Sequence, residues 1–177
     1  YPSNTKEAVD HAARLGYKFV EIDITTTKDK VWVVNHDANS KELLTDITKE
    51  SKTFTTMLSA VITKMKLQRK WKGGGYWEFS DKLNKEYVPT LEDVLKYAKD
   101  KNIYLILDNK TLSHHQFTDE EYDSLADLIN KYKDYTVNIL NIEREQKKPR
   151  KDFSAYSEIK SSIWYMYDDE FNSFSNN

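Results

Sequence analysis

Three short hydrophobic segments with ionisable residues set into them constrain most strongly what this chain can fold into. They cover residues 19–24, 31–37 and 103–110. Side chains alternate between the two faces of a β-strand, so Glu21 and Asp23 in the first segment share one face, and the apolar residues beside them take the other. The sequence therefore predicts strands that are apolar on one side and charged on the other.

The second and third segments follow the same design. His36 stands near the end of the second segment, and Asp108 and Lys110 share one face of the third. Burying such groups without partners is costly, so we expect them to contact a metal ion, an anion or one another. Their positions predict a functional site at the carboxyl ends of a parallel sheet.

Helical patterns alternate with these strands. The polar stretch between the first two strands predicts a short, hairpin-like connection. The alternation as a whole is typical of an α/β fold with a parallel sheet, in which ligands bind beyond the carboxyl ends of the strands. Capping residues and amphipathic spacing predict helices at about 4–15, near 55–70, after Thr90, after Thr118 and at 153–160, with further strands at 135–142 and 162–167.

Size and composition fit one domain over residues 1–177, with 38–88 as an insertion or loop region and 147–151 as an exposed basic loop. The 27 Lys and Arg residues balance 29 Asp and Glu residues, which gives no reason to expect a nucleic-acid partner or an anionic membrane surface. No apolar run reaches the length of a membrane span. The sequence leaves the oligomeric state open, and the localisation open between secreted, periplasmic and cytoplasmic.

The acidic residues suit a hard divalent cation. The chain has no cysteine, so thiolate ligands are excluded, and Glu21, Asp23 and Asp108 offer the oxygen ligands that Mg²⁺ and Ca²⁺ prefer. Lys110 can hold an anionic substrate beside the metal, and His36 can transfer a proton near neutral pH. Together these groups fit nucleophilic attack at a phosphorus centre.

Five motifs also occur in a characteristic order and spacing within the first 110 residues. They are PSNT at 2–5, LGYKFVEIDI at 15–24, TKD at 27–29, VVNHD at 33–37 and VPTLEDVL at 88–95. In this order and spacing the chain resembles the glycerophosphodiester phosphodiesterase family.

The resemblance implies a TIM-type barrel, incomplete in this chain, and hydrolysis of small-molecule glycerophosphodiesters to glycerol 3-phosphate and an alcohol. It also implies a divalent cation, Ca²⁺ or Mg²⁺. Position by position, Glu21 and Asp23 match metal ligands, and His36 matches the second catalytic histidine. Lys110 matches the lysine of a Glu-x-Lys motif, in which Asp108 replaces the glutamate ligand.

The chain departs from the family pattern at several points. Ser3 replaces the acid of a Pro-Glu-Asn-Thr motif, and the family's first catalytic histidine belongs to a His-Arg-Gly motif that precedes it. The 177 residues are also fewer than the roughly 250 of a typical TIM barrel. Two alternatives therefore stay open: a non-catalytic relative that binds a phosphodiester or a sugar, and a phospholipase-type activity in which the aromatic cluster at 71–79 contacts lipid.

The remaining candidate groups favour structural interpretations. Asp37 is expected to support the loop after the second strand, His11 lies on a helix, and His114 and His115 are expected in a loop with nothing to fix their geometry. Asp108 stays open between a metal ligand and a structural acid.

Overall fold

The computed structural model describes residues 3–40, 51–66, 69–71, 77–79, 86–111 and 115–140. The expected helix at 153–160, the strand at 162–167 and the basic loop at 147–151 lie outside these ranges. The helices are α1 (Lys6–Arg14), α2 (Ser59–Ile62), α3 (Leu91–Lys101) and α4 (Asp119–Lys131), and the strands are β1 (Phe19–Thr26), β2 (Trp32–Val34), β3 (Arg69–Trp71), β4 (Trp77–Phe79), β5 (Tyr104–Asn109) and β6 (Thr136–Leu140).

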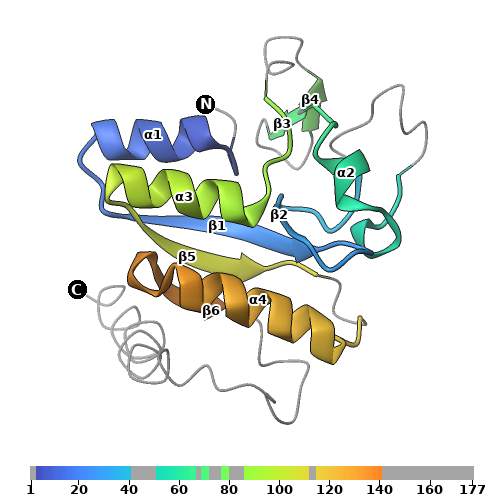
Figure 1. The fold of residues 1–177 in the computed structure, drawn as a ribbon. Helices are drawn as coiled ribbons and strands as arrows, with labels where there is room; N and C mark the ends of the chain where they lie inside the picture. Colours follow the sequence, from blue (N-terminus) through green and yellow to red (C-terminus); the bar gives the residue numbers. More distant parts are fainter. Residues whose placement is uncertain are drawn as a thin grey trace, which may run out of the picture.

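Four of the strands form one sheet in the order β2-β1-β5-β6. β1 pairs with β5 and β5 with β6 in parallel, whereas β2 runs antiparallel to β1 and confirms the expected hairpin. Figure 1 shows α1 and α3 side by side along the sheet, with α4 beside β5 and β6. The described part of the chain is an α/β structure that corresponds to an incomplete TIM barrel.

One face of the sheet is buried beneath these helices. The apolar residues of β1 and β5 that alternate with the acids form a core with side chains from α1, α3 and α4. These strand residues are Ile22, Ile24, Leu105 and Leu107, each at most 2% exposed. Because neighbouring side chains alternate along a strand, Glu21, Asp23 and Asp108 take the opposite face, as the sequence predicts.

The helix ends agree with the capping signals in the sequence. Thr5 accepts a hydrogen bond from the Ala8 N–H at the start of α1, and Gly16 follows its end with a positive φ of 86°. Thr90 opens α3 in the same way, and Thr118 forms a reciprocal capping box with Glu121 at the start of α4. These local interactions explain why the helix starts were predictable.

The long helix expected near 55–70 is wrong. The structure has a single 3-10 turn at Phe54–Thr56 and then only the four residues of α2. Backbone bonds to other segments replace helical ones here: the Lys28 N–H donates to the Met57 carbonyl, and the Val88 N–H donates to the Met65 carbonyl. The apolar side chains instead fill a second small core, made of Val33, Phe54, Met57, Ile62, Met65 and Val88.

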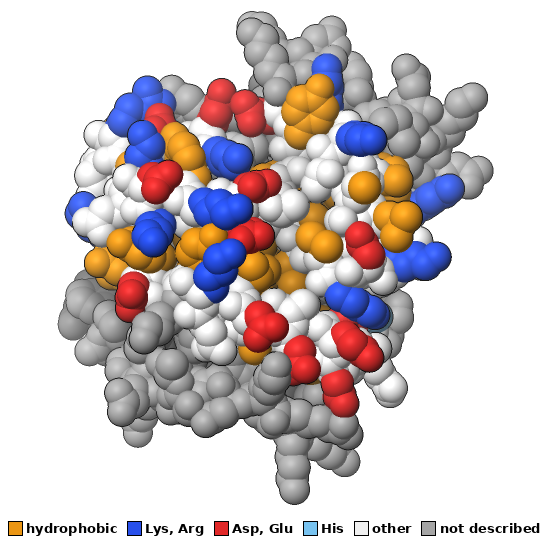
Figure 2. Space-filling view, viewed as in Figure 1, with side chains coloured by type: hydrophobic (Ala, Val, Ile, Leu, Met, Phe, Trp, Pro, Cys, Tyr) orange, Lys and Arg blue, Asp and Glu red, His pale blue; other side chains and the backbone are white. Residues whose placement is uncertain are grey.

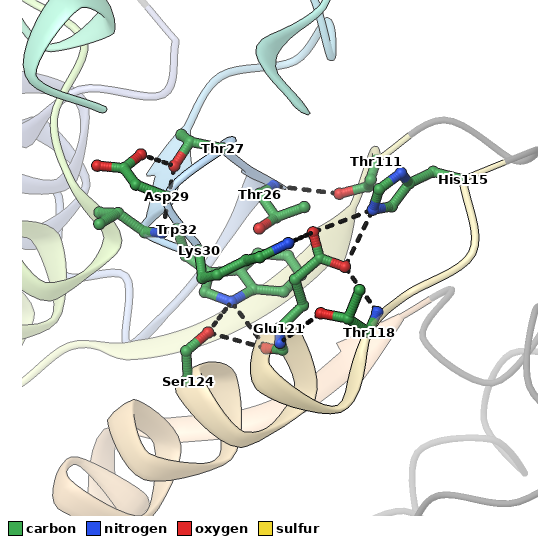
Figure 3. A network of polar contacts seen from close by, with 11 residues as sticks. Thr26, Thr27, Asp29, Lys30, Trp32, Thr111, His115, Thr118, Glu121 and Ser124 are labelled. Atoms are coloured by element: carbon green, nitrogen blue, oxygen red, sulfur yellow. Dashed lines mark hydrogen bonds and ion pairs between the residues drawn. The ribbon is translucent and has the colours of Figure 1, made fainter. Parts of the chain in front are cut away.

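A buried carboxylate fastens the β1–β2 turn to α4. Glu121 is 1% exposed, and its oxygens contact Lys30 Nζ at 3.3 Å, His115 Nε2 at 3.0 Å and the Thr118 N–H at 2.8 Å (Figure 3). The indole N–H of Trp32 also reaches the Glu121 carbonyl, at 3.3 Å. His115 is therefore fixed by a specific partner, contrary to the sequence interpretation, whereas His114 lies outside the described residues.

We expect Glu121→Ala to lower the free energy of unfolding by about 3 kcal/mol. Breaking a buried ion pair from one side costs about 3–5 kcal/mol, and the lower end applies because Lys30 and His115 partly reach solvent. Urea denaturation measures the change, and Glu120→Ala, an exposed acid on the same turn, is the matched control. Equal stability of the two variants would contradict a structural role for Glu121.

A second carboxylate ties the β1–β2 turn to α2. Asp29 accepts hydrogen bonds from the Thr27 hydroxyl at 2.7 Å, the Ser59 N–H at 2.8 Å and the Ser59 hydroxyl at 2.7 Å. Partial burial acts to raise the pKa of Asp29, but these hydrogen bonds outweigh it, and the net pKa lies below the usual 3.8. The ionised form of Asp29 is therefore the one that stabilises the fold.

We expect Asp29→Asn to destabilise the protein by about 1 kcal/mol or less at pH 7, because water screens an exposed charge. A depressed pKa in the folded state gives stability that is full above the unfolded-state pKa and is lost as the pH falls through the folded-state value. The difference between wild type and Asp29→Asn in urea denaturation should therefore shrink between pH 5 and pH 3. A difference that does not change with pH would contradict this role of the charge.

Candidate active site

The register of two parallel strands creates an acidic cluster on the sheet face opposite α1, α3 and α4. Asp23 in β1 lies directly beside Asp108 in β5. Glu21 lies two residues before Asp23 in β1, so its side chain is on the same face of the sheet. One carboxylate oxygen from each of the three acids lies within 4.8 Å of the others. The structure thus brings together all three acids that the sequence singled out as metal ligands.

Crowding of the acids changes the ionisation of Glu21. Desolvation is the main cause that raises the pKa of Glu21 to about 7, and the negative charges of Asp23 and Asp108 raise it further, while Lys110 and His36 act in the opposite direction. Three carboxylates whose oxygens lie within 4.8 Å of one another offer a divalent cation the oxygen ligands that it prefers.

Lys110 bridges two of the acids. Its ammonium group contacts Asp108 Oδ2 at 2.7 Å and Asp23 Oδ1 at 3.3 Å. Burial acts to lower the pKa of Lys110, but the hydrogen bond and charge of Asp108, together with those of Asp23, raise it above the usual value. Lys110 is therefore a fixed positive charge at the edge of the cluster.

His36 approaches the cluster from the antiparallel strand of the expected hairpin, and not from the end of a parallel strand. Because β2 is antiparallel to β1, the chain after β2 returns toward the middle of β1, and the Asn35 N–H donates to the Asp23 carbonyl at 3.0 Å. Glu21 and Asp23 likewise lie inside β1, before its end at Thr26. Asp23, Asp108 and Lys110 lie at the carboxyl end of the parallel β1–β5 pairing, as expected, whereas His36 follows an antiparallel strand.

The His36 side chain is half exposed and is oriented by its neighbour. Its Nδ1 lies 2.9 Å from Asp37 Oδ1, and the side chain is 52% exposed. The buried Asn35 shapes this turn by donating from its side-chain amide to the Asp37 carbonyl at 2.7 Å. When Nδ1 carries the ring proton and donates it to Asp37, Nε2 is the nitrogen that can accept a proton from a ligand.

Asn4 is a contact of the cluster that the sequence analysis missed. Its side chain makes two hydrogen bonds to Asp23, one to the carboxylate and one from the backbone N–H. Asn4 belongs to the PSNT motif at 2–5, but that motif alone does not predict a contact with Asp23. The contact joins residues 19 positions apart, and no local signal in the sequence reveals it.

Two further features bear on what the chain can bind. Lys and Arg side chains are intermingled with Asp and Glu over the face that carries α1 and α3 (Figure 2), as the balanced charge suggests. Among the described residues, no helix combines the length and apolar character needed to cross a membrane.

Comparison with known families agrees with this site. The model of the glycerophosphoryl diester phosphodiesterase family matches residues 1–151, and the chain belongs to this family. No protein with a curated description matches the sequence significantly.

Solved structures of this class show the same fold. A glycerophosphodiester phosphodiesterase from Agrobacterium tumefaciens is 21% identical, with a TM-score of 0.59 over 81% of this chain and 54% of its own. One from Parabacteroides distasonis is 23% identical, with a TM-score of 0.57 over 80% and 51% of the two chains. A phosphodiesterase from Oleispira antarctica, solved in complex with the product sn-glycerol-3-phosphate, is 20% identical, with a TM-score of 0.53 over 74% and 47%. The chain thus spans about half the length of these structures.

Proposed function

We propose that this chain carries part of the active site of a metal-dependent phosphodiesterase that hydrolyses glycerophosphodiesters to glycerol 3-phosphate and an alcohol. The observation that carries the proposal is the position of three acids, a lysine and a half-exposed histidine around one point of the sheet in a member of this family. The substrate is a small-molecule phosphodiester, and the domain extends over residues 1–177.

Glu21, Asp23 and Asp108 would hold a divalent cation, Mg²⁺ or Ca²⁺. Their oxygens are close enough to share one ion, and oxygen is the ligand that both ions prefer. A bound cation would neutralise negative charge that develops on the phosphoryl oxygens. The shorter Asp108 replaces the family's glutamate without leaving the cluster, which supports its role as a ligand.

Lys110 and His36 would have different roles in binding and in proton transfer. Lys110 carries a positive charge beside two of the acids and would bind a phosphate oxygen of the substrate there. His36 is accessible and can transfer a proton at Nε2 to or from the oxygen that enters or leaves. Asp37 orients the ring through Nδ1.

Hydrolysis of glycerophosphocholine by the full-length protein tests the proposal. The assay measures glycerol 3-phosphate with Ca²⁺, with Mg²⁺ and with a chelator. Release that requires a divalent cation supports the proposed function. A folded protein that releases nothing with either ion contradicts it.

A non-catalytic relative that binds the phosphodiester is the second candidate. Ser3 in place of the family's acid favours it. Calorimetric binding of glycerophosphocholine without turnover would support this candidate, and lysophospholipid cleavage in the same assay would instead support the phospholipase-type activity.

A further inference from the structure

Asn4 holds Asp23 from both ends of that residue. The Asn4 side-chain amide donates from Nδ2 to Asp23 Oδ2 at 2.8 Å, and Asn4 Oδ1 accepts from the Asp23 backbone N–H at 2.9 Å. Both polar ends of the Asn4 amide are therefore used on a single partner. Asp23 itself is only 8% exposed, so water replaces these bonds poorly.

The backbone around Asn4 makes this contact rigid. Asn4 has a positive φ of 62°, a conformation that Asn tolerates better than most residues. Thr5 then caps α1, and α1 is fixed to the core through the fully buried Val9. The Asn4 amide is thus anchored to a helix that is packed against the sheet on which Asp23 lies.

The two oxygens of Asp23 consequently have different environments. Oδ2 is occupied by Asn4, whereas Oδ1 is the oxygen that faces Lys110 and, through it, Asp108. Oδ1 is the oxygen turned toward the cluster. A carboxylate held in this way keeps one orientation toward the cluster, because rotation of the carboxylate breaks the bond from Asn4 Nδ2.

We propose that Asn4 is a positioning residue that fixes the orientation of the Asp23 carboxylate and thereby favours Mg²⁺ over Ca²⁺ at this site. Mg²⁺ requires near-octahedral geometry at short distances, whereas Ca²⁺ readily accepts a carboxylate through both oxygens and tolerates irregular geometry. The inference rests on the proposed function for the existence of the metal site. The inference goes beyond the proposed function by naming the residue that orients a metal ligand and the ion that this orientation favours.

Isothermal titration of the full chain with Mg²⁺ and, separately, with Ca²⁺ tests this inference without substrate. Asn4→Gly keeps the positive φ accessible and removes both hydrogen bonds. Asn4→Asp keeps the size and the acceptor for the Asp23 N–H, removes the donor, and serves as the second variant if Asn4→Gly folds poorly. Asn102→Gly is the matched control, because Asn102 is also left-handed, with a φ of 54°, and ends α3.

The expected result is a loss of Mg²⁺ affinity of roughly 10- to 100-fold in Asn4→Gly, the range typical for removing a partner that orients a metal ligand. Ca²⁺ affinity should fall by a smaller factor, so the ratio of Mg²⁺ to Ca²⁺ affinity decreases in both Asn4 variants and stays at the wild-type value in Asn102→Gly. If Asn4 had a purely structural role, its replacement would weaken the binding of both ions equally and leave the ratio of Mg²⁺ to Ca²⁺ affinity unchanged.

The wild-type titration separates the two ways in which the inference can fail. If wild type binds both ions and the affinity ratio is unchanged in the Asn4 variants, the positioning role is overturned while the proposed metal site stands. If wild type binds neither ion, the metal site is wrong and the inference falls with it.

Discussion

Replacing Asp23 by Asn is expected to lower the affinity for Mg²⁺ and Ca²⁺ by more than about 100-fold, beyond the roughly 10- to 100-fold cost of losing an outer partner. Asp23 is the central acid of the cluster: it lies beside Asp108 in the register, contacts Lys110 at 3.3 Å and is held by Asn4. The substitution removes a negative charge and a ligand oxygen while keeping the size of the side chain. Isothermal titration with each ion measures the effect.

Asp100→Asn is the matched control for this experiment. Asp100 is an exposed acid on α3, so the same chemical change there should leave the affinity for both ions at the wild-type value. Thermal unfolding without metal shows whether the Asp23 variant still folds. A folded Asp23→Asn protein with full metal affinity and full turnover would contradict the proposed metal site.

Replacing His36 by Gln should reduce kcat for glycerophosphocholine hydrolysis by about 10²- to 10⁴-fold, the usual contribution of a general acid or base. The His36 side chain is 52% exposed and contacts Asp37 at the surface, so its loss should change stability little. Metal affinity should also stay close to that of wild type, because the three acids that would bind the ion do not include His36. Steady-state kinetics and calorimetry together measure this separation.

His11→Gln provides the comparison for His36. His11 lies on α1, on the helix-covered side of the sheet, and the same substitution there should leave kcat unchanged. Comparable kcat values for wild type and His36→Gln would show that proton transfer in this protein does not depend on His36.

The sequence predicted that the three candidate acids share one face of the sheet, because the signals for this arrangement are local. Alternation along β1 and β5 assigns Glu21, Asp23 and Asp108 to one face from the strand period alone. The helix starts at Thr90 and Thr118 followed from capping residues within four positions of one another. The chemistry of the candidate site was therefore visible before any long-range contact was known.

The misinterpreted residues are held by contacts that lie outside their own segment. Apolar residues such as Met57 and Met65 have helix-like spacing, yet backbone bonds to Lys28 and Val88 hold this stretch in short turns. His115 looked unconstrained because its partner Glu121 belongs to the following helix and is buried by the packing of α4.

The sequence by itself determined which side chains could share a face, where helices begin and which ligand chemistry the chain offers, because these properties depend on the geometry of a few neighbouring residues. Only the tertiary structure decided the register that places Asp23 beside Asp108 and the contact from Asn4 to Asp23. Strand register and contacts between distant segments follow from the packing of the whole core, so no local pattern specifies them.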